Sequence, residues 1–263
     1  MVSSGFFLLV FVLTILVAVS LRFYLPLARL VLVQQQGRVG SWWVGRIDAL
    51  VAIVLVAWFA MMGRAALMDE GSKVVEFHHV VTGSVVYASV VLFLGGILIY
   101  RNYPLSRVFG WDAGSFAQAL GQGLLYLAAA YPLLLLVQAM VYGGLGMDEQ
   151  PQEVVQFLRD AVSSRDRIAI LVMAIVIAPV AEETIFRGYL YPVAKRYLGS
   201  FVALAGTSLL FAILHGHLSS IPALFTLAMC LGLAYEKSGS LLVPMIMHAV
   251  FNAVSAGAII FLL

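Results

Sequence analysis

The chain has 263 residues, of which 63% are hydrophobic and only 11% are charged, and its mean hydropathy is +1.03. Soluble domains average about 45–50% apolar and about 25% charged residues, so this composition excludes an ordinary soluble protein and predicts a polytopic membrane protein. The formal net charge of +2 comes from scattered basic residues, and no nucleic-acid partner is expected. The single cysteine, Cys230, cannot form a disulfide within the chain.

About eight apolar stretches are long enough to cross a hydrocarbon core of about 30 Å, which takes roughly 17–25 helical residues. Several of them carry polar side chains in mid-stretch, which indicates that these side chains face one another inside a bundle. The expected fold is therefore all-α, a polytopic membrane protein of about eight transmembrane helices with an intramembrane polar cavity. The approximate ranges are 5–21, 48–63, 80–100, 116–142, 168–190, 200–216, 220–235 and 240–262.

The first stretch could instead be a cleaved signal peptide. Residues 6–17 resemble the apolar core of such a peptide, and Val17, Ala18, Val19 and Ser20 offer small residues for cleavage. No Lys or Arg precedes the stretch, so the basic segment expected of a signal peptide is missing. We therefore expect an uncleaved membrane anchor.

Basic residues predict the orientation. Under the positive-inside rule, the loops that are richest in Lys and Arg lie in the cytoplasm, which puts both termini outside. We expect an integral protein of a bacterial plasma membrane whose active site opens toward the cytoplasm. The loops after the odd-numbered stretches hold most of the basic residues, namely Arg22, Arg29, Arg38, Arg46, Arg101, Arg107, Arg187, Lys195, Arg196 and Lys237.

A polar segment, residues 143–167, separates the fourth and fifth stretches. Its apolar residues recur at helical spacing after Pro151, which is typical of a short helix lying in the membrane interface. An ordinary solvated connector is the alternative. The apolar positions are Val154, Val155, Leu158, Ala161 and Val162.

Two adjacent glutamates, Glu182 and Glu183, follow an almost wholly apolar run at residues 168–180. Charged side chains within a membrane helix are costly and usually face a cavity or a partner, so they indicate a functional site. Adjacent helical positions point about 100° apart, so the two carboxylates should have different surroundings. Glu183 and Arg187 stand four residues apart in the favoured order for an ion pair, which leaves Glu182 available as a general base. Two interfacial charges that anchor a helix end are the alternative.

Two later stretches carry histidines. His215 stands four residues after Phe211, and His248 stands four before Asn252, so each pair should share one helix face. The Asn252 amide and an N–H of neutral His248 can both donate to a developing oxyanion. A hydrogen-bonded core histidine is the ordinary alternative for either residue alone. His217 is a further candidate, but it lies at the polar end of its stretch.

Depth along the helices offers a check. At 1.5 Å per residue, Glu182 should lie roughly 13 Å, and His248 about 12 Å, from the same face of the membrane. The two depths agree. His215 comes out deeper, roughly 22 Å from Ser200, unless the sixth helix starts above the membrane.

The three motifs resemble those of the CAAX prenyl endopeptidase and bacteriocin-processing family of intramembrane proteases, also called the CPBP or ABI family. That family carries Glu-Glu-x-x-x-Arg, Phe-x-x-x-His and His-x-x-x-Asn, which stand here at residues 182–187, 211–215 and 248–252. The resemblance covers about residues 168–257. We accordingly divide the chain into N-terminal transmembrane helices of unknown role, residues 1–115, and a CPBP-like protease core, residues 116–263.

The resemblance implies that glutamate-activated water hydrolyses a peptide bond of a membrane-associated or lipidated substrate. Glu182 would activate the water that His215 helps to hold, and His248 with Asn252 would stabilise the tetrahedral oxyanion. The implied catalytic residues are Glu182, His215, His248 and Asn252, with structural support from Glu183, Arg187 and Phe211.

The family has been described both as zinc-dependent and as metal-free. Glu182, His215 and His248 could ligate Zn²⁺ and leave a fourth position open, as catalytic zinc requires. No His-Glu-x-x-His helix supports such a site, so we expect a metal-free enzyme and keep zinc as the alternative.

Two other functions remain open: bacteriocin self-immunity or peptide maturation by a protein of the same fold, and a non-catalytic scaffold or transporter whose intramembrane charges form an ion path. A scaffold has no need of a base together with two oxyanion donors, so the complete set favours catalysis. The expected partners are the lipid bilayer and a membrane-embedded or membrane-delivered peptide.

Overall fold

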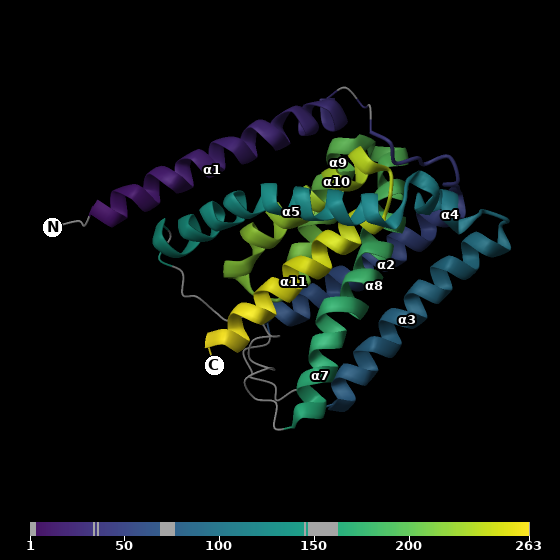
Figure 1. Cartoon of the computed structure of the whole chain (residues 1–263). Helices are drawn as coiled ribbons and strands as arrows, with labels where there is room; N and C mark the ends of the chain where they lie inside the picture. The colour runs from purple at the N-terminus through teal and green to yellow at the C-terminus, as the bar shows by residue number, and fades with distance from the viewer. Residues whose placement is uncertain are drawn as a thin grey trace.

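The computed structural model of the chain describes residues 4–33, 35, 37–68, 77–144, 146 and 163–262. Within these ranges every regular element is a helix, as Figure 1 shows. The all-α fold predicted from the sequence is confirmed. The apolar positions between 154 and 162, for which an interfacial helix was predicted, lie outside the described residues.

The first half of the chain contains four long helices. Helix α5 begins at the N-cap Ser115, whose hydroxyl accepts a hydrogen bond from the backbone N–H of Gln118. The elements in this half are α1 (Ser4–Ala28), the π-helical turn η1 (Arg29–Val33), α2 (Arg46–Met68), α3 (Phe77–Tyr100), the short α4 (Leu105–Val108), the 3₁₀ turn η2 (Trp111–Ala113), α5 (Phe116–Ala139) and η3 (Met140–Gly144).

In the second half, a run of helical elements without a break widens twice into π-helix. Its parts are α7 (Ser164–Val172), η4 (Met173–Ile177), α8 (Ala178–Glu183), η5 (Thr184–Leu190) and α9 (Tyr191–Ile213). Gly199 interrupts α9 with φ 78° and ψ 165°, a conformation that glycine tolerates and that kinks the helix. The 3₁₀ turn η6 (Leu218–Ser220), α10 (Ile221–Ser238) and α11 (Leu242–Leu262) complete the chain.

Six of the described helical segments are long and apolar enough to cross a membrane by length and composition. One of them, Ser164–Ile213, spans 50 residues and contains the kink at Gly199, so it holds the two stretches predicted at 168–190 and 200–216. A further apolar helix, Leu242–Ala258, is shorter. Each predicted stretch thus corresponds to a helical segment, and the protein is a multi-pass integral membrane protein.

The first predicted stretch, residues 5–21, was too short. Helix α1 runs to Ala28 and continues through η1, although the sequence has a charge at Arg22 and a proline at Pro26. The Arg22 side chain is exposed, so a single arginine does not end the helix. Tyr24 then packs inward and donates its hydroxyl to the backbone oxygen of Tyr126 on α5, at 2.7 Å.

The helices differ in how far they are enclosed. In α10, 61% of the membrane-crossing window is buried by other helices, against 11% in α3. Figure 1 shows α1 along one edge of the bundle and α3 beside α7 at another, with α5 and α11 between them. The core therefore lies around α5, α8, α9, α10 and α11, and α3 touches it with one face.

Two buried carboxylates connect the N-terminal part of the chain to this core: Asp48 lies at the start of α2, and Glu236 on α10 accepts a hydrogen bond from the backbone N–H of Val39 at 3.1 Å. Asp48 pairs with Arg101 and accepts a hydrogen bond from the hydroxyl of Tyr189 at 3.1 Å. Glu236 pairs with Lys195 and also accepts from the hydroxyl of Tyr191. Tyr189 and Tyr191 lie directly after the first polar motif, so residues 1–115 help to hold the helix that carries that motif.

Candidate active site

The first motif lies at the junction of α8 and η5, buried between neighbouring helices. Arg187 Nη1 and Glu183 Oε1 are 2.9 Å apart, and both side chains are almost fully enclosed. Arg187 Nη2 also donates to the backbone oxygen of Ala228 on α10, at 3.0 Å. The expected ion pair is therefore present, although the helix is π-helical over Thr184–Leu190, and it ties the motif to α10.

Glu183 has a second partner that the sequence did not predict. His248 on α11 donates its Nδ1–H to Glu183 Oε1 at 2.9 Å. Because an ionised carboxylate can only accept, this contact fixes the hydrogen on Nδ1 and orients the ring. The other ring nitrogen, Nε2, then lies 3.8 Å from Glu182 Oε2. Glu182 and His248 therefore lie close together, in agreement with the similar depths predicted for them.

This geometry limits how His248 can donate a hydrogen bond from Nε2. A neutral ring that carries its hydrogen on Nδ1 has only a lone pair on Nε2, so it has no N–H to offer in that direction. His248 can donate from Nε2 only as an imidazolium, with both nitrogens protonated. An N–H donated from Nε2 by neutral His248 would therefore require the ring to give up the Nδ1–H contact with Glu183.

Glu182 and Glu183 differ in surroundings, as their angular separation predicted. About 12% of the Glu182 side chain is exposed, while Glu183 is fully buried. Glu182 Oε1 accepts a 2.7 Å hydrogen bond from the hydroxyl of Tyr87 on α3. Tyr87 is not among the site residues predicted from the sequence. Its signal was a tyrosine in the middle of an apolar stretch, far from the ends where tyrosines of the aromatic belt lie.

The ring of Phe211, in the second motif, is close to side chains of all three motifs. This ring lies 4.7 Å from the Arg187 guanidinium, 4.8 Å from the His215 ring and 5.7 Å from the His248 ring. Phe211 therefore connects the first motif to both histidines.

The expectation that His215 lies within a helix is wrong. Helix α9 ends at Ile213, and His215 lies in the turn before Gly216, which has φ 74°. Its Nδ1–H still donates to the backbone oxygen of Phe211 at 2.8 Å, so Nε2 of the neutral ring remains an acceptor.

Asn252 lies one turn after His248 on α11. Its Nδ2 donates to the backbone oxygen of Ala174 in η4, at 2.8 Å. An amide NH₂ carries two hydrogens, so one N–H remains beyond this contact. Asn252 thus joins α11 to the helix of the first motif and keeps one donor.

The zinc alternative can be tested against the side chains. In the described part of the chain, no three His, Cys, Asp or Glu side chains are placed to hold a metal ion together. His215 and His248 both use Nδ1 in hydrogen bonds, which leaves Nε2 of each ring as the possible ligand atom. As they are placed, Glu182, His215 and His248 do not form a three-ligand zinc site.

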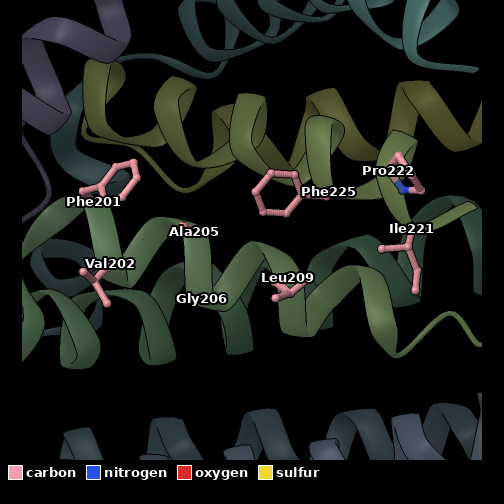
Figure 2. A pocket seen from close by; sticks show the side chains of 8 residues that line it. All are labelled: Phe201, Val202, Ala205, Gly206, Leu209, Ile221, Pro222 and Phe225. Atoms are coloured by element: carbon pink, nitrogen blue, oxygen red, sulfur yellow. The ribbon is translucent and has the colours of Figure 1, made fainter. Parts of the chain in front are cut away.

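A pocket of about 500 Å³ lies between α9 and α10, away from this polar cluster. Its walls are almost entirely apolar, and Figure 2 shows its side chains facing one another across the two helices. The exposed side chains of Phe201, Val202 and Leu209 line it, so it opens on the outside of the bundle. This apolar pocket is therefore separate from the polar residues of the three motifs.

Known proteins resemble this chain in the region that holds the three motifs. Residues 164–254 match the family model described as type II CAAX prenyl endopeptidase Rce1-like, a range that includes all three motifs. An uncharacterized 24.3 kDa protein of Escherichia coli is 27% identical over 214 residues, which cover 74% of this chain and 89% of that protein. No solved structure gives a significant match. The family resemblance predicted from the motifs is confirmed.

Proposed function

Because residues 164–254 match the family model of the Rce1-like type II CAAX prenyl endopeptidases, we propose that this membrane protein is an endopeptidase in which Glu182 activates water. The substrate would be a membrane-associated or lipidated peptide or protein. One observation carries the proposal: two adjacent glutamates lie on either side of one histidine. Glu183 orients His248 through Nδ1, and Glu182 faces Nε2 of the same ring.

The charge balance of the cluster supports this assignment. Glu182 and Glu183 carry two negative charges when ionised, and Arg187 supplies one positive charge. An unbalanced charge is costly in a low-dielectric interior, so one further proton is expected on the pair formed by Glu182 and His248. With that proton on Nε2 of His248, the cluster is neutral and Glu182 remains a carboxylate able to act as a base.

Hydrolysis can then proceed with a single proton that moves to Glu182 and back. The Glu182 carboxylate takes one proton from a water molecule while the water oxygen attacks the scissile carbonyl carbon and forms the new C–O bond, so the negative charge moves to the carbonyl oxygen. Nε2 of His215 accepts a hydrogen bond from the other O–H of that water. The His248 imidazolium and the remaining N–H of Asn252 donate to the tetrahedral oxyanion. When the C–N bond breaks, Glu182 returns its proton to the leaving amine.

The electrostatics favour the transition state. Negative charge leaves Glu182 as it accepts a proton and appears on the oxyanion, so the net charge of the buried cluster does not change. Preorganised donors that face developing charge in a site with little water supply a large share of catalysis in many enzymes. In this account Glu183, Arg187 and Phe211 position the histidines. We further propose that the site opens toward the cytoplasm of a bacterial cell, as the distribution of basic residues predicts.

The proposal is tested by comparing membrane fractions from cells with wild-type protein and with Glu182→Gln. The glutamine has the same shape and still accepts from Tyr87, so only the basic carboxylate is lost. We expect new peptide termini in the wild-type fraction that are missing with the variant. Identical termini in both fractions would contradict the proposal.

A further inference from the structure

Tyr87 contacts the proposed base but lies outside the three motifs and the family match. Its hydroxyl donates to Glu182 Oε1 at 2.7 Å, across 95 residues of sequence. The family model begins at residue 164, while Tyr87 lies on α3 in the N-terminal part. This contact connects residues 1–115 directly to the proposed base.

The inward face of α3 places Tyr87 at the site. Leu94 and Leu98 on this face are fully buried, whereas Val85, Leu92 and Phe93 on the other faces are exposed. One turn before Tyr87, Ser84 Oγ lies 3.0 Å from Met173 Sδ in η4. Helix α3 therefore rests on η4 and α8 with a narrow stripe, and Tyr87 is the residue of that stripe at the level of Glu182.

We propose that Tyr87 is a positioning residue for Glu182, an inference that rests on the proposed function. The terminal torsion of a glutamate is broad, so a carboxylate held at one oxygen has far fewer orientations than a free one. With Oε1 held by Tyr87, Oε2 faces His248 Nε2 at 3.8 Å. Loss of the hydroxyl frees the carboxylate to rotate, which misaligns the base without removing it.

Tyr24 provides a matched control. Its hydroxyl also makes a 2.7 Å hydrogen bond between two helices, but the acceptor is the backbone oxygen of Tyr126. Tyr24→Phe and Tyr87→Phe each remove one such bond, and only Tyr87 contacts the proposed base. A purely structural role for Tyr87 would make the two variants behave alike.

The test measures kcat, KM and melting temperature of the full-length protein in liposomes, using the peptide identified from membrane fractions. A hydrogen bond to a charged group contributes more free energy than a neutral one. Its loss in Tyr87→Phe should therefore lower kcat by about tenfold to a hundredfold, with KM nearly unchanged. Tyr24→Phe should keep the wild-type kcat. Equal kcat for Tyr87→Phe and wild type, or an effect confined to KM, would overturn the inference while leaving the proposed function intact.

A double variant tests whether the effect passes through Glu182. Glu182→Asp withdraws the carboxylate from Tyr87, so Tyr87→Phe should cost little more in that background. Full multiplication of the two losses would contradict a positioning role. If Tyr87→Phe does not fold, 4-fluorophenylalanine at position 87 fills the place of the hydroxyl without an O–H donor, and an unchanged kcat would overturn the inference.

An infrared measurement separates this inference from the proposed function. The difference spectrum between wild type and Glu182→Gln reports the Glu182 carboxyl band, which should shift in the Tyr87→Phe background and not in the Tyr24→Phe background. A carboxyl band whose frequency is unchanged in the Tyr87→Phe background would refute the contact itself. A shifted band in a protein without any peptidase activity would uphold the contact and reject the function.

Discussion

His248 donates its Nδ1–H to Glu183 at 2.9 Å, so the glutamate that pairs with Arg187 also fixes the ring proposed to stabilise the oxyanion. One carboxylate oxygen, Oε1, serves both partners. The structural and the catalytic parts of the site are therefore linked through a single atom, and removing the charge of Glu183 should disturb both.

The two glutamates should respond differently to the same substitution. Glu182→Gln should abolish turnover with the melting temperature in detergent close to that of wild type. Glu183→Gln should lower the melting temperature, because breaking one side of a buried ion pair costs about 3–5 kcal/mol. It should also lower kcat through His248. Equal and purely catalytic losses from both variants would contradict the division of roles.

His248 and Asn252 should behave as one oxyanion-binding unit. Loss of one such donor typically costs about 10²–10³ in kcat, so Asn252→Ala should lower kcat strongly with KM nearly unchanged. Because both donors serve the same charge, the double variant with His248→Gln should be much less than multiplicatively impaired. Full multiplication, or an effect on KM alone, would assign Asn252 to substrate binding or to its contact with Ala174.

The local parts of this site followed from the sequence. Four-residue spacing gave the pair of Glu183 and Arg187, and helical rise placed Glu182 and His248 at one depth, because both depend only on position along a helix. Contacts that depend on how helices are rotated against each other did not follow. The π-helical segments η4 and η5 change the angular step along the chain, so the faces meeting Tyr87 and His248 could not be assigned by counting.

The end of α9 shows the same limit of local patterns. Phe211 and His215 have helical spacing, yet the helix stops at Ile213 and the turn is closed by Gly216. Gly216, three residues after Ile213, is a helix stop signal that the prediction of a continuous helix over 200–216 did not use. The ring contact of Phe211 with His215 survives because the Nδ1–H still reaches the Phe211 oxygen.

Metal dependence is open to direct measurement. If Glu182 acts as a metal-free base, purified protein should contain less than stoichiometric zinc by elemental analysis and should keep its activity after exhaustive chelation. Loss of activity on chelation that Zn²⁺ alone restores would establish a metalloprotease, with ligands brought together by rearrangement of Glu182, His215 and His248.

Two glycines of α5, Gly121 and Gly123, test how α11 packs against this helix. A methyl group added at Gly123 would lie 2.9 Å from Ile246 on α11, while one added at Gly121 would meet nothing within 4 Å. Gly123→Ala should lower the melting temperature by overpacking, which costs about 1–3 kcal/mol, and should reduce kcat by moving His248. Gly121→Ala should leave both unchanged. Equal behaviour of the two variants would contradict this helix packing.

The central claim is that water activated by Glu182 cleaves a peptide bond, and oxygen labelling tests it most directly. Membranes with wild-type protein, Glu182→Gln or Tyr24→Phe are incubated in water enriched in ¹⁸O, and new carboxyl termini are analysed by mass spectrometry. The account predicts new termini that carry one ¹⁸O atom with wild-type protein and Tyr24→Phe, and none with Glu182→Gln. Absence of such termini with wild type, or labelled termini that persist with Glu182→Gln, would contradict it.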